Sequence, residues 1–313
     1  IQKSEKKRKR NYLLITSASI AASILICMST IYFMNLETVV DLDFQAIAEG
    51  LDSQTVDEVT LITAKEQLNL DEDAFIKYSK EGKVAVNSQV IKEEKVKDEQ
   101  EYNQLIVPSG KRARIELSDG TRLVVNSQSK VVYPRRFKGD IRKIYTQGEV
   151  FLEVAHDEKH PFIVETEKYN VRVLGTTFNV SAYPDSDLFE TSLIEGKVTV
   201  YQPDTQNEVT LQPNEKVETR DGKLCKEAFT SDHAFLWRIG VYSFKNEPLE
   251  AVFKKLEQYY EVRIINKNIE IASRPCTGKF RQKEGIEHVV KVLQKYVGFD
   301  YTLDEENNQI IIY

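Results

Sequence analysis

The sequence has few of the residues that build metal and redox sites. Its 313 residues include four histidines, one tryptophan and three cysteines, Cys27, Cys225 and Cys276. The cysteines form no C-x-x-C motif and no metal-binding pair, which excludes the usual zinc and redox motifs. Cys225 and Cys276 can pair in an oxidising compartment, but a disulfide needs a Cβ geometry that spacing does not define. We expect no cofactor and no metal site.

Positive charge is concentrated in one short stretch. Residues 1–10 carry six basic residues against Glu5, a net charge of +5, whereas the whole chain carries −6. The remaining residues therefore carry −11. This argues against nucleic acid as the main ligand, because phosphate contacts need clustered Lys and Arg. The basic residues that we expect to set the orientation in a membrane are Lys6, Lys7, Arg8, Lys9 and Arg10.

Long apolar runs are absent except for one, at residues 11–36. These 26 residues carry no charge, and about 20 are enough for a helix to cross lipid. A cleaved signal peptide has a shorter apolar region, of about 7–15 residues. The positive-inside rule places residues 1–10 in the cytoplasm and 37–313 outside it, with a single-pass transmembrane helix at 11–36. Because the sequence begins with Ile1 and not with Met, we expect it to be a fragment of a longer protein whose preceding cytoplasmic segment is missing here.

Residues 37–230 have the pattern of an all-β domain. Short apolar alternations are separated by acidic-Gly or amide-Gly pairs, which supply positive φ at tight turns. Their spacing predicts a sandwich or a solenoid of short hairpins. The predicted turns are Glu81-Gly82, Asp119-Gly120, Gln147-Gly148, Glu195-Gly196 and Asp221-Gly222.

Two patterns in this domain look catalytic, but neither has the context that its chemistry needs. His156 and His160 have the spacing of a zinc-protease motif, which requires a helix and a Glu where Asp157 stands. Ser109-Gly110-Lys111 looks like part of a phosphate loop, but Arg112 stands where a Ser or Thr is required. We interpret both as turns. No nucleophile elbow is present, so we do not expect an enzyme.

Residues 231–313 have the pattern of a small α+β domain with the order β-α-β-β-α-β-β. Strands are predicted at 239–244, 262–265 and 276–280, and again after Gly298, which is suited to end the second helix. We expect both helices to pack on one face of one small sheet. Their apolar faces comprise Leu249, Val252, Phe253, Leu256, Tyr259 and Tyr260, and then Ile286, Val289, Val290, Leu293, Tyr296 and Val297.

From about residue 103 to 200 the chain resembles the FecR-type anti-sigma regulators, in their Bacteroidetes-type form. The resemblance rests on a series of segments in order. These are Val107-Pro108-Ser109-Gly110, Leu117-Ser118-Asp119-Gly120-Thr121, Val132-Tyr133-Pro134, Gly148-Glu149-Val150-Phe151, Pro161-Phe162-Ile163-Val164, Val173-Leu174-Gly175-Thr176-Thr177-Phe178-Asn179-Val180 and Leu193-Ile194-Glu195-Gly196-Lys197-Val198. Residues 237–313 are similar to the family's C-terminal domain, which resembles the short N-terminal module of secretins and TonB-dependent transporters (STN-like).

The resemblance implies a signalling relay across the bacterial inner membrane. In such a relay the periplasmic region senses the signalling domain of a TonB-dependent outer-membrane transporter. The cytoplasmic N-terminus controls an extracytoplasmic-function sigma factor. Most of that sigma-binding domain is missing from this sequence. The implied partners are therefore the transporter domain, the sigma factor and the lipid bilayer.

The resemblance also implies candidate site residues. Some family members cut themselves at a Gly-Thr bond that corresponds to Gly175-Thr176, by attack of the Thr hydroxyl on the Gly carbonyl. The alternative is a plain turn in which Gly175 is needed for its dihedral angles. For partner binding we expect strand addition or face packing at 239–244 and 276–280. Trp237 fits either the domain seam or a partner anchor. The candidate residues are Trp237, Val241, Tyr242, Phe244, Thr277, Lys279 and Phe280.

A membrane-tethered envelope protein that binds carbohydrate or cell-wall polymer is the alternative function. It needs rows of exposed aromatic side chains, and the 15 tyrosines permit them. The tyrosines are dispersed along the chain without a period, which favours the regulator.

Overall fold

The computed structural model describes residues 44–48, 56–90, 102–203, 205, 207–229, 235–304 and 306–313. No helix in these ranges is long and apolar enough to cross a membrane. The expected fold class, a transmembrane helix followed by a sandwich or solenoid, is therefore corrected to a mostly β structure with short helices. The predicted segment 11–36 and the basic residues Lys6–Arg10 lie outside the described residues.

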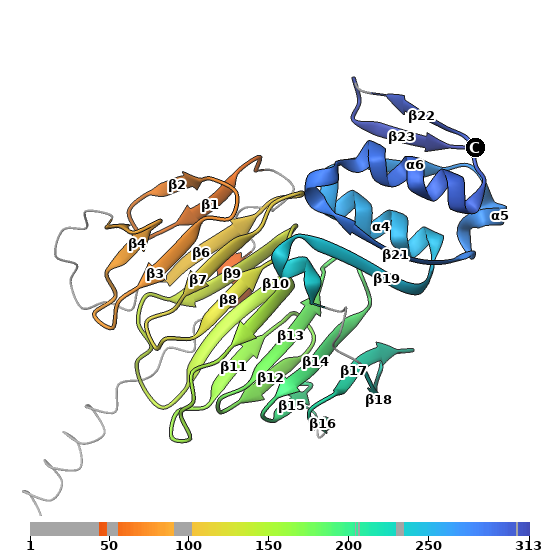
Figure 1. The fold of residues 1–313 in the computed structure, drawn as a ribbon. Coiled ribbons are helices and arrows are strands. Elements are labelled where there is room, and N and C mark those ends of the chain that lie inside the picture. The colour runs from red at the N-terminus through yellow and green to blue at the C-terminus, as the bar shows by residue number, and fades with distance from the viewer. Residues whose placement is uncertain are drawn as a thin grey trace, which may run out of the picture. The chain divides into compact units, whose positions relative to one another are not determined.

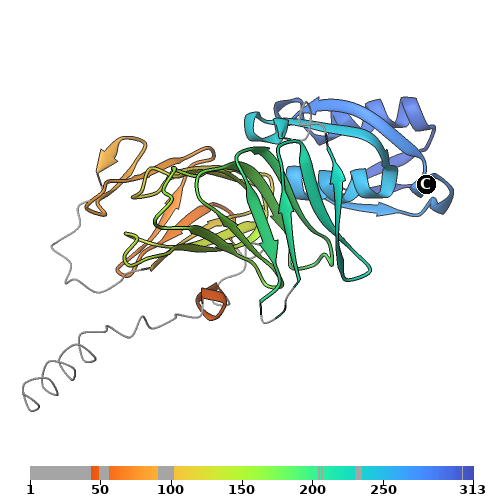
Figure 2. The ribbon, with the colours of Figure 1, turned by 90° about the horizontal axis from the view of Figure 1, so that it is seen from below.

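In the described residues, 18 strands form one large curled sheet (Figures 1 and 2). One half of the sheet contains, in spatial order, β2 (Gln67–Leu70), β1 (Val59–Ile62), β6 (Tyr102–Val107), β9 (Ser129–Pro134), β10 (Arg142–Glu153), β11 (Phe162–Glu165), β12 (Asn170–Val173), β15 (Val198–Tyr201) and β16 (Glu208–Leu211). We call it the β9 half.

The other half, the β8 half, also passes through β10. Its order is β5 (Gln89–Val90), β4 (Val84–Val86), β3 (Phe75–Tyr78), β7 (Ala113–Glu116), β8 (Arg122–Val125), β10, β13 (Thr177–Ala182), β14 (Phe189–Glu195), β17 (Glu215–Arg220) and β18 (Lys223–Ala228). A short helix, α2 (Phe44–Ala48), packs against Val132 and Tyr145 of the β9 half.

Strand β10 joins the two halves. Residues 142–147 pair with β9 and β11, whereas residues 148–153 pair with β8 and β13. Gly148 lies where the strand passes from one half to the other, with φ +89, and a Cβ there would lie 2.7 Å from Ser129 Cα. The glycine therefore permits both the backbone conformation and the close approach of β9.

The hairpin prediction fails at two of the five glycine pairs for the same reason. Gln147-Gly148 lies inside β10 and not in a turn. Glu195-Gly196 connects β14 of the β8 half to β15 of the β9 half, so it is a change of layer and not a hairpin. Two parallel pairings, β3 with β7 and β10 with β11, also depart from a series of hairpins. A Gly pair shows that the backbone bends, but not which strands pair beyond the bend.

The apolar alternation of the sequence forms the interior of the sheet. One core contains side chains from both halves, including Val59, Leu61, Ile115, Val150 and Phe178, each at most 1% exposed. Three polar side chains inside the sheet pair with one another. The hydroxyls of Tyr78 and Tyr133 lie 3.2 Å apart, and Asn103 Nδ2 donates to Tyr78 at 2.8 Å. Buried polar groups that are hydrogen-bonded in this way avoid the cost of desolvation without a partner.

The C-terminal module, residues 235–313, has two small sheets and not one. Strand β19 (Val241–Pro248) pairs with β21 (Pro275–Arg281), and β20 (Arg263–Asn266) and β22 (Tyr301–Asp304) flank β23 (Gln309–Ile312). Helices α4 (Leu249–Tyr260) and α6 (Ile286–Val297) are drawn between the two sheets in Figure 1. The predicted packing on one face of a single sheet is thus wrong. Short segments η1 (Leu236–Ile239), α5 (Ile269–Ala272) and η2 (Gln282–Glu284) complete the module.

The predicted apolar faces of the two helices are mostly correct. Leu249, Val252, Phe253, Leu256 and Tyr259 of α4 are buried, as are Val289, Val290, Leu293 and Val297 of α6. Tyr260 and Ile286 are half-buried, and Tyr296 is 67% exposed. Gly298 ends α6 in the left-handed conformation, as expected.

Candidate functional site

The Gly175–Thr176 peptide lies between β12 and β13, where the backbone on both sides is held. The amide of Asp157 donates to the carbonyl of Leu174 at 2.8 Å, and the amide of Val154 donates to the carbonyl of Thr176 at 3.0 Å. Gly175 does not have a positive φ. A Cβ at this position would lie 2.5 Å from His156 Nδ1 and 2.6 Å from His156 Cα. Glycine is therefore needed for the close approach of His156 and not for its dihedral angles.

The Thr176 hydroxyl is engaged in a hydrogen bond. Thr176 is buried, and its Oγ1 donates to the carbonyl of Lys197 at 3.1 Å. Gly196, with φ +94, packs so closely that a Cβ would lie 2.8 Å from both Gly175 O and Thr176 Oγ1. The hydroxyl lies in a crowded, paired environment, and neither Gly175 nor Thr176 has the positive φ that would indicate local backbone strain.

Arg142 fixes the loops around this peptide. Its side chain is 5% exposed, and it donates to Asp119 Oδ2 at 2.9 Å and to the carbonyls of His160, Ala155 and Leu174 at 2.8, 2.7 and 3.3 Å. The guanidinium also lies 5.3 Å from the ring centre of Phe162. Such a buried charge is stable only when it is fully paired, as here. No spacing in the sequence pointed to this residue.

The segment from His156 to His160 lies in the connection between β10 and β11. It is a polar turn, but not the hairpin turn that the sequence predicted, because β10 and β11 pair in parallel. Asp157 accepts hydrogen bonds from the amides of Lys159 and His160, and its Oδ2 lies 2.7 Å from His160 Nδ1. The hydrogen bond with the His160 ring, followed by the backbone donors, lowers the pKa of Asp157 to about 2. The carboxylate therefore organises the turn. The described residues contain no group of side chains arranged to hold a metal ion.

The predicted partner-binding residues on β19 and β21 divide into two groups. Tyr242, Phe244 and Phe280 are buried in the core of the module, so they cannot contact a partner unless the module unpacks. Thr277 and Lys279 are exposed, and Val241 is half-buried. The two strands pair with each other, with Tyr242 opposite Phe280, which leaves one edge of each strand without a partner in this sheet.

Trp237 lies at the seam between the sheet and the C-terminal module. It is 4% exposed and belongs to an apolar cluster that also contains Phe151 of β10 and Phe235. The rings of Phe151 and Phe235 are 5.6 Å apart, and Arg238 lies 3.7 Å from the centre of the Phe151 ring. The structure thus places Trp237 in the seam.

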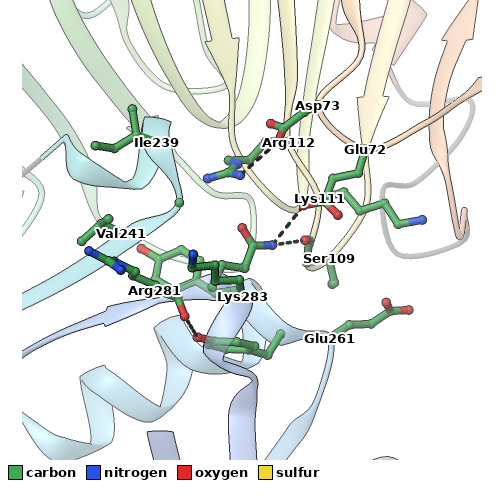
Figure 3. Close-up of a pocket in the computed structure, with 15 residues that line it drawn as sticks. Glu72, Asp73, Ser109, Lys111, Arg112, Ile239, Val241, Glu261, Arg281 and Lys283 are labelled. Carbon is green, nitrogen blue, oxygen red and sulfur yellow. Dashed lines mark hydrogen bonds and ion pairs between the residues drawn. The ribbon is translucent and has the colours of Figure 1, made fainter. Parts of the chain in front are cut away.

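A cavity of about 780 Å³ opens beside this seam (Figure 3). The turn between β6 and β7 contributes Ser109, Lys111 and Arg112, and the C-terminal module contributes residues of η1, α4, β21 and η2. The two parts touch directly. Arg112 Nη1 donates to the carbonyl of Trp237 at 2.7 Å, and Gln282 Nε2 donates to the carbonyl of Gly110 at 2.5 Å. Nothing in the sequence predicted this cavity, because Gly110 and Gln282, which meet at its wall, are 172 residues apart along the chain.

Glu149 of β10 is a further titratable group. Its carboxylate accepts hydrogen bonds from Asn126 Nδ2 at 2.7 Å and Asn179 Nδ2 at 3.0 Å. The residue keeps some solvent exposure, but burial of the carboxyl group raises its pKa above the usual value, against the effect of both hydrogen bonds.

Cys225 and Cys276 are both free thiols.

Comparison with known proteins gives a consistent family assignment. The model of the family described as FecR protein matches residues 103–199, and that described as FecR, C-terminal, matches residues 241–312. No curated protein matches the chain.

Two crystal structures, at 1.65 and 2.50 Å resolution, are similar to this chain. Both are of a protein from Parabacteroides distasonis that is classed as an anti-sigma factor. They share 31% and 30% sequence identity with this chain and cover 67% and 68% of it. The match covers 98% of each of those chains, with a TM-score of 0.61. The chain therefore belongs to the FecR family of anti-sigma factors.

Proposed function

We propose that this anti-sigma factor senses the signalling domain of a TonB-dependent outer-membrane transporter and relays that signal to an extracytoplasmic-function sigma factor. The observation that carries the proposal is the pairing of two family modules through one apolar cluster, in which Phe151 of the sheet packs with Phe235 and Trp237. A body of this kind suits a binding role, because a packed seam lets one module respond to a ligand of the other. The likeness of the C-terminal module to STN domains is part of the same proposal.

The free strand edges of β19 and β21 are the proposed surface for the transporter domain. An unpaired edge can hydrogen-bond an added strand, and exposed side chains beside it set specificity. We expect the double variant Thr277→Glu, Lys279→Glu to weaken binding of the isolated signalling domain by about tenfold, because a tenfold loss needs only about 1.4 kcal/mol. Lys254→Glu, on the exposed side of α4, is the control for the charge reversal at Lys279. Equal affinity of all three proteins in a titration would show that these strands are the wrong surface.

The relay itself is tested with the full-length protein in detergent. We expect a pull-down to recover the sigma factor, and to recover the transporter when the inducing nutrient is present. Loss of the sigma factor from every sample would contradict the relay.

We also propose the location of the two ends of the chain. Residues 37–313 lie in the periplasm and the N-terminal residues in the cytoplasm, at the inner membrane. The charge asymmetry between residues 1–10 and the acidic remainder supports this. Alkaline phosphatase fused after Tyr313 is expected to be active in cells, since it folds only in an oxidising compartment. An inactive fusion of normal abundance would refute the location.

We propose that the chain acts by binding, without substrate turnover. A single self-cleavage remains the chemical hypothesis to test. In that reaction Thr176 Oγ1 bonds to the Gly175 carbonyl carbon, its proton passes to the departing Thr176 nitrogen, and water hydrolyses the resulting ester. The hydrogen bond from Thr176 to Lys197 favours an intact chain. Mass spectrometry of the wild type and Thr176→Ala decides between them, since only cleavage predicts two fragments that the variant lacks.

The carbohydrate-binding alternative receives no support from the surface. In the described part of the chain only two aromatic side chains, Tyr296 and Tyr313, are exposed. Two rings do not form the platform that stacking on sugar rings requires.

A further inference from the structure

The cavity beside the seam carries cationic side chains that lack carboxylate partners. Lys111, Arg281 and Lys283 line it, and none of them forms an ion pair with any described residue. Among the described residues some surface cations elsewhere are paired, as in Lys77–Glu116 at 3.0 Å and Lys226–Glu215 at 2.9 Å, and others are single unpaired residues. At this cavity several cations without a described carboxylate partner line one site.

Arg112 adds a buried charge to the same wall. Its side chain is 8% exposed and its one ion pair, to Asp73, is long at 3.4 Å and reaches a carboxylate that is half exposed. The Nε atom has no hydrogen-bond partner in the protein. Because a buried charge is screened less than an exposed one, the positive potential of Arg112 extends into the cavity.

The carboxylates of the cavity do not neutralise these groups. Asp73 is engaged by Arg112, and Glu72 accepts a hydrogen bond from Gln282 Nε2 at 3.4 Å. In Figure 3 Glu261 lies on the opposite side of the cavity from Arg281 and Lys283. One side of the cavity is therefore cationic.

Apolar groups lie on this cationic side. Ile239 is 73% exposed and Val241 is half-buried, and Figure 3 draws both on the side where the nitrogen atoms of Arg112, Arg281 and Lys283 lie. The Tyr260 hydroxyl donates to the carbonyl of Arg281 at 3.2 Å, which fixes the strand end that carries Arg281. The combination of cations and an exposed aliphatic side chain is complementary to a ligand that is both acidic and apolar.

We propose that this cavity binds an acidic peptide segment of a protein partner. Its carboxylates would face Arg281 and Lys283 over the buried Arg112, and an aliphatic side chain would cover Ile239 and Val241. A volume of about 780 Å³ accommodates a few residues of peptide. A small inorganic anion would leave the apolar part of the wall uncovered. The inference deepens the proposed function, because it rests on a sensing role and names the chemistry by which a partner is held.

Such a segment would contact both modules at once. Lys111 and Arg112 belong to the turn between β6 and β7, whereas Arg281 and Lys283 belong to the C-terminal module. A ligand that binds only when the two modules are docked stabilises the docked arrangement by linkage. Binding at this cavity would therefore be communicated from one module to the other.

The test is a fluorescence anisotropy titration of the full chain with a labelled peptide of sequence S-L-E-E-L-E-S. We expect saturable binding that the double variant Arg281→Glu, Lys283→Glu weakens by at least about tenfold, since like charges replace attraction. The control Lys245→Glu, Lys254→Glu makes the same change in net charge at exposed positions outside the cavity. It is expected to change the affinity by less than about twofold, because exposed charges beyond a Debye length are screened.

Three results would overturn the proposal. The first is no saturable binding to the wild type, and the second is equal weakening in both double variants, which indicates non-specific attraction. The third is displacement of the peptide by succinate or inorganic phosphate at the peptide's own concentration, which indicates a small-anion site. The neutral variant Arg281→Gln, Lys283→Gln, checked by circular dichroism, separates loss of charge from loss of folding. If the cavity fails while the signalling domain still binds, only the peptide site is wrong and the proposed function stands.

Discussion

Arg142 and Arg112 are both buried arginines, but they differ in how many of their side-chain nitrogens are hydrogen-bonded. Arg142, in the sheet, uses all three of its side-chain nitrogens as donors, to three carbonyls and to Asp119 at 2.9 Å. Arg112, at the seam, has one short hydrogen bond, one long ion pair and an Nε without a protein partner. Trp237 Nε1, Tyr242 Oη and Gln282 Oε1 beside it also lack protein partners. Arg142 in the sheet is thus fully paired, whereas Arg112 at the seam keeps an unused donor.

The largest effect is expected from Arg142→Met. The substitution leaves the half-buried Asp119 and three carbonyls without their donor, so we expect the free energy of unfolding to fall by about 4 kcal/mol. Arg112→Met removes weaker contacts and should cost about 1 kcal/mol. Urea unfolding followed by tryptophan fluorescence and circular dichroism measures both. Similar losses of unfolding free energy in the two variants would show that the different pairing of the two arginines has no effect on stability.

Phe151→Ala is expected to act on the seam. The ring is 2% exposed and contacts Phe235 and Arg238, so its truncation should cost about 3 kcal/mol. Because Phe151 belongs to the apolar cluster of the C-terminal module, we expect the module to become sensitive to protease before the sheet does. Limited proteolysis with mass spectrometry reads this order, and simultaneous digestion of both parts would contradict it.

Two glycines with nearly equal φ separate backbone conformation from space. Gly148 and Gly120 have φ +89 and +87, but only Gly148 has a neighbour within 4 Å of an added Cβ. Gly120→Ala should cost about 1 kcal/mol for its dihedral angle alone. We expect Gly148→Ala to cost about 2 kcal/mol more, since β9 must move. Equal midpoints of thermal unfolding in the two variants would show that Ser129 can move away from the added Cβ without a loss of stability.

The smallest effect concerns the pH dependence that Glu149 contributes. Burial raises its pKa above the ordinary 4.5, with Glu190 adding to the rise and Asn126, Asn179 and Lys255 opposing it. A raised carboxyl pKa means that the folded state holds its proton more tightly than the unfolded chain. The stabilisation that Glu149 contributes is therefore fully present at pH values below its pKa in the unfolded chain. It is lost as the pH rises through its pKa in the folded protein.

In Glu149→Gln this loss of stability with rising pH should disappear. Asn179 Oδ1 lacks a hydrogen-bond partner, so its amide can turn to accept from the new side chain. Urea unfolding at a series of pH values from 4 to 8 measures the difference between the two proteins. An identical pH slope in both would refute the assignment to Glu149.

Local patterns in the sequence predicted what depends on neighbours along the chain. Leu249, Val252, Phe253 and Leu256 are buried because a helix brings every third and fourth residue to one face. Tyr296 follows the same spacing but extends beyond the module's core, because the length of a buried face is set by the partner surface.

Pairing at long range could not be predicted from the same patterns. The sequence around Gly148 is equally suited to a hairpin and to a strand that changes layers, and Ser129 decides between them. The division of the C-terminal strands into two sheets depends on β20 finding β23, about 46 residues away by the Arg263–Gln309 pairing. The cavity is the extreme case. Nothing in the local sequence of the Lys111-Arg112 turn indicates that Arg281 and Lys283 lie beside it.

Strand β10 has a mechanical consequence for the C-terminal module and the loops around Gly175. At its C-terminal end Phe151 is embedded in the core of the C-terminal module, and at its N-terminal end Arg142 holds the loops around Gly175. A load applied at one end reaches the other through a single run of covalent bonds, reinforced by neighbouring strands on both sides. The strand therefore couples its two ends rigidly, and a displacement of the C-terminal module is transmitted along β10 to the loops around Gly175.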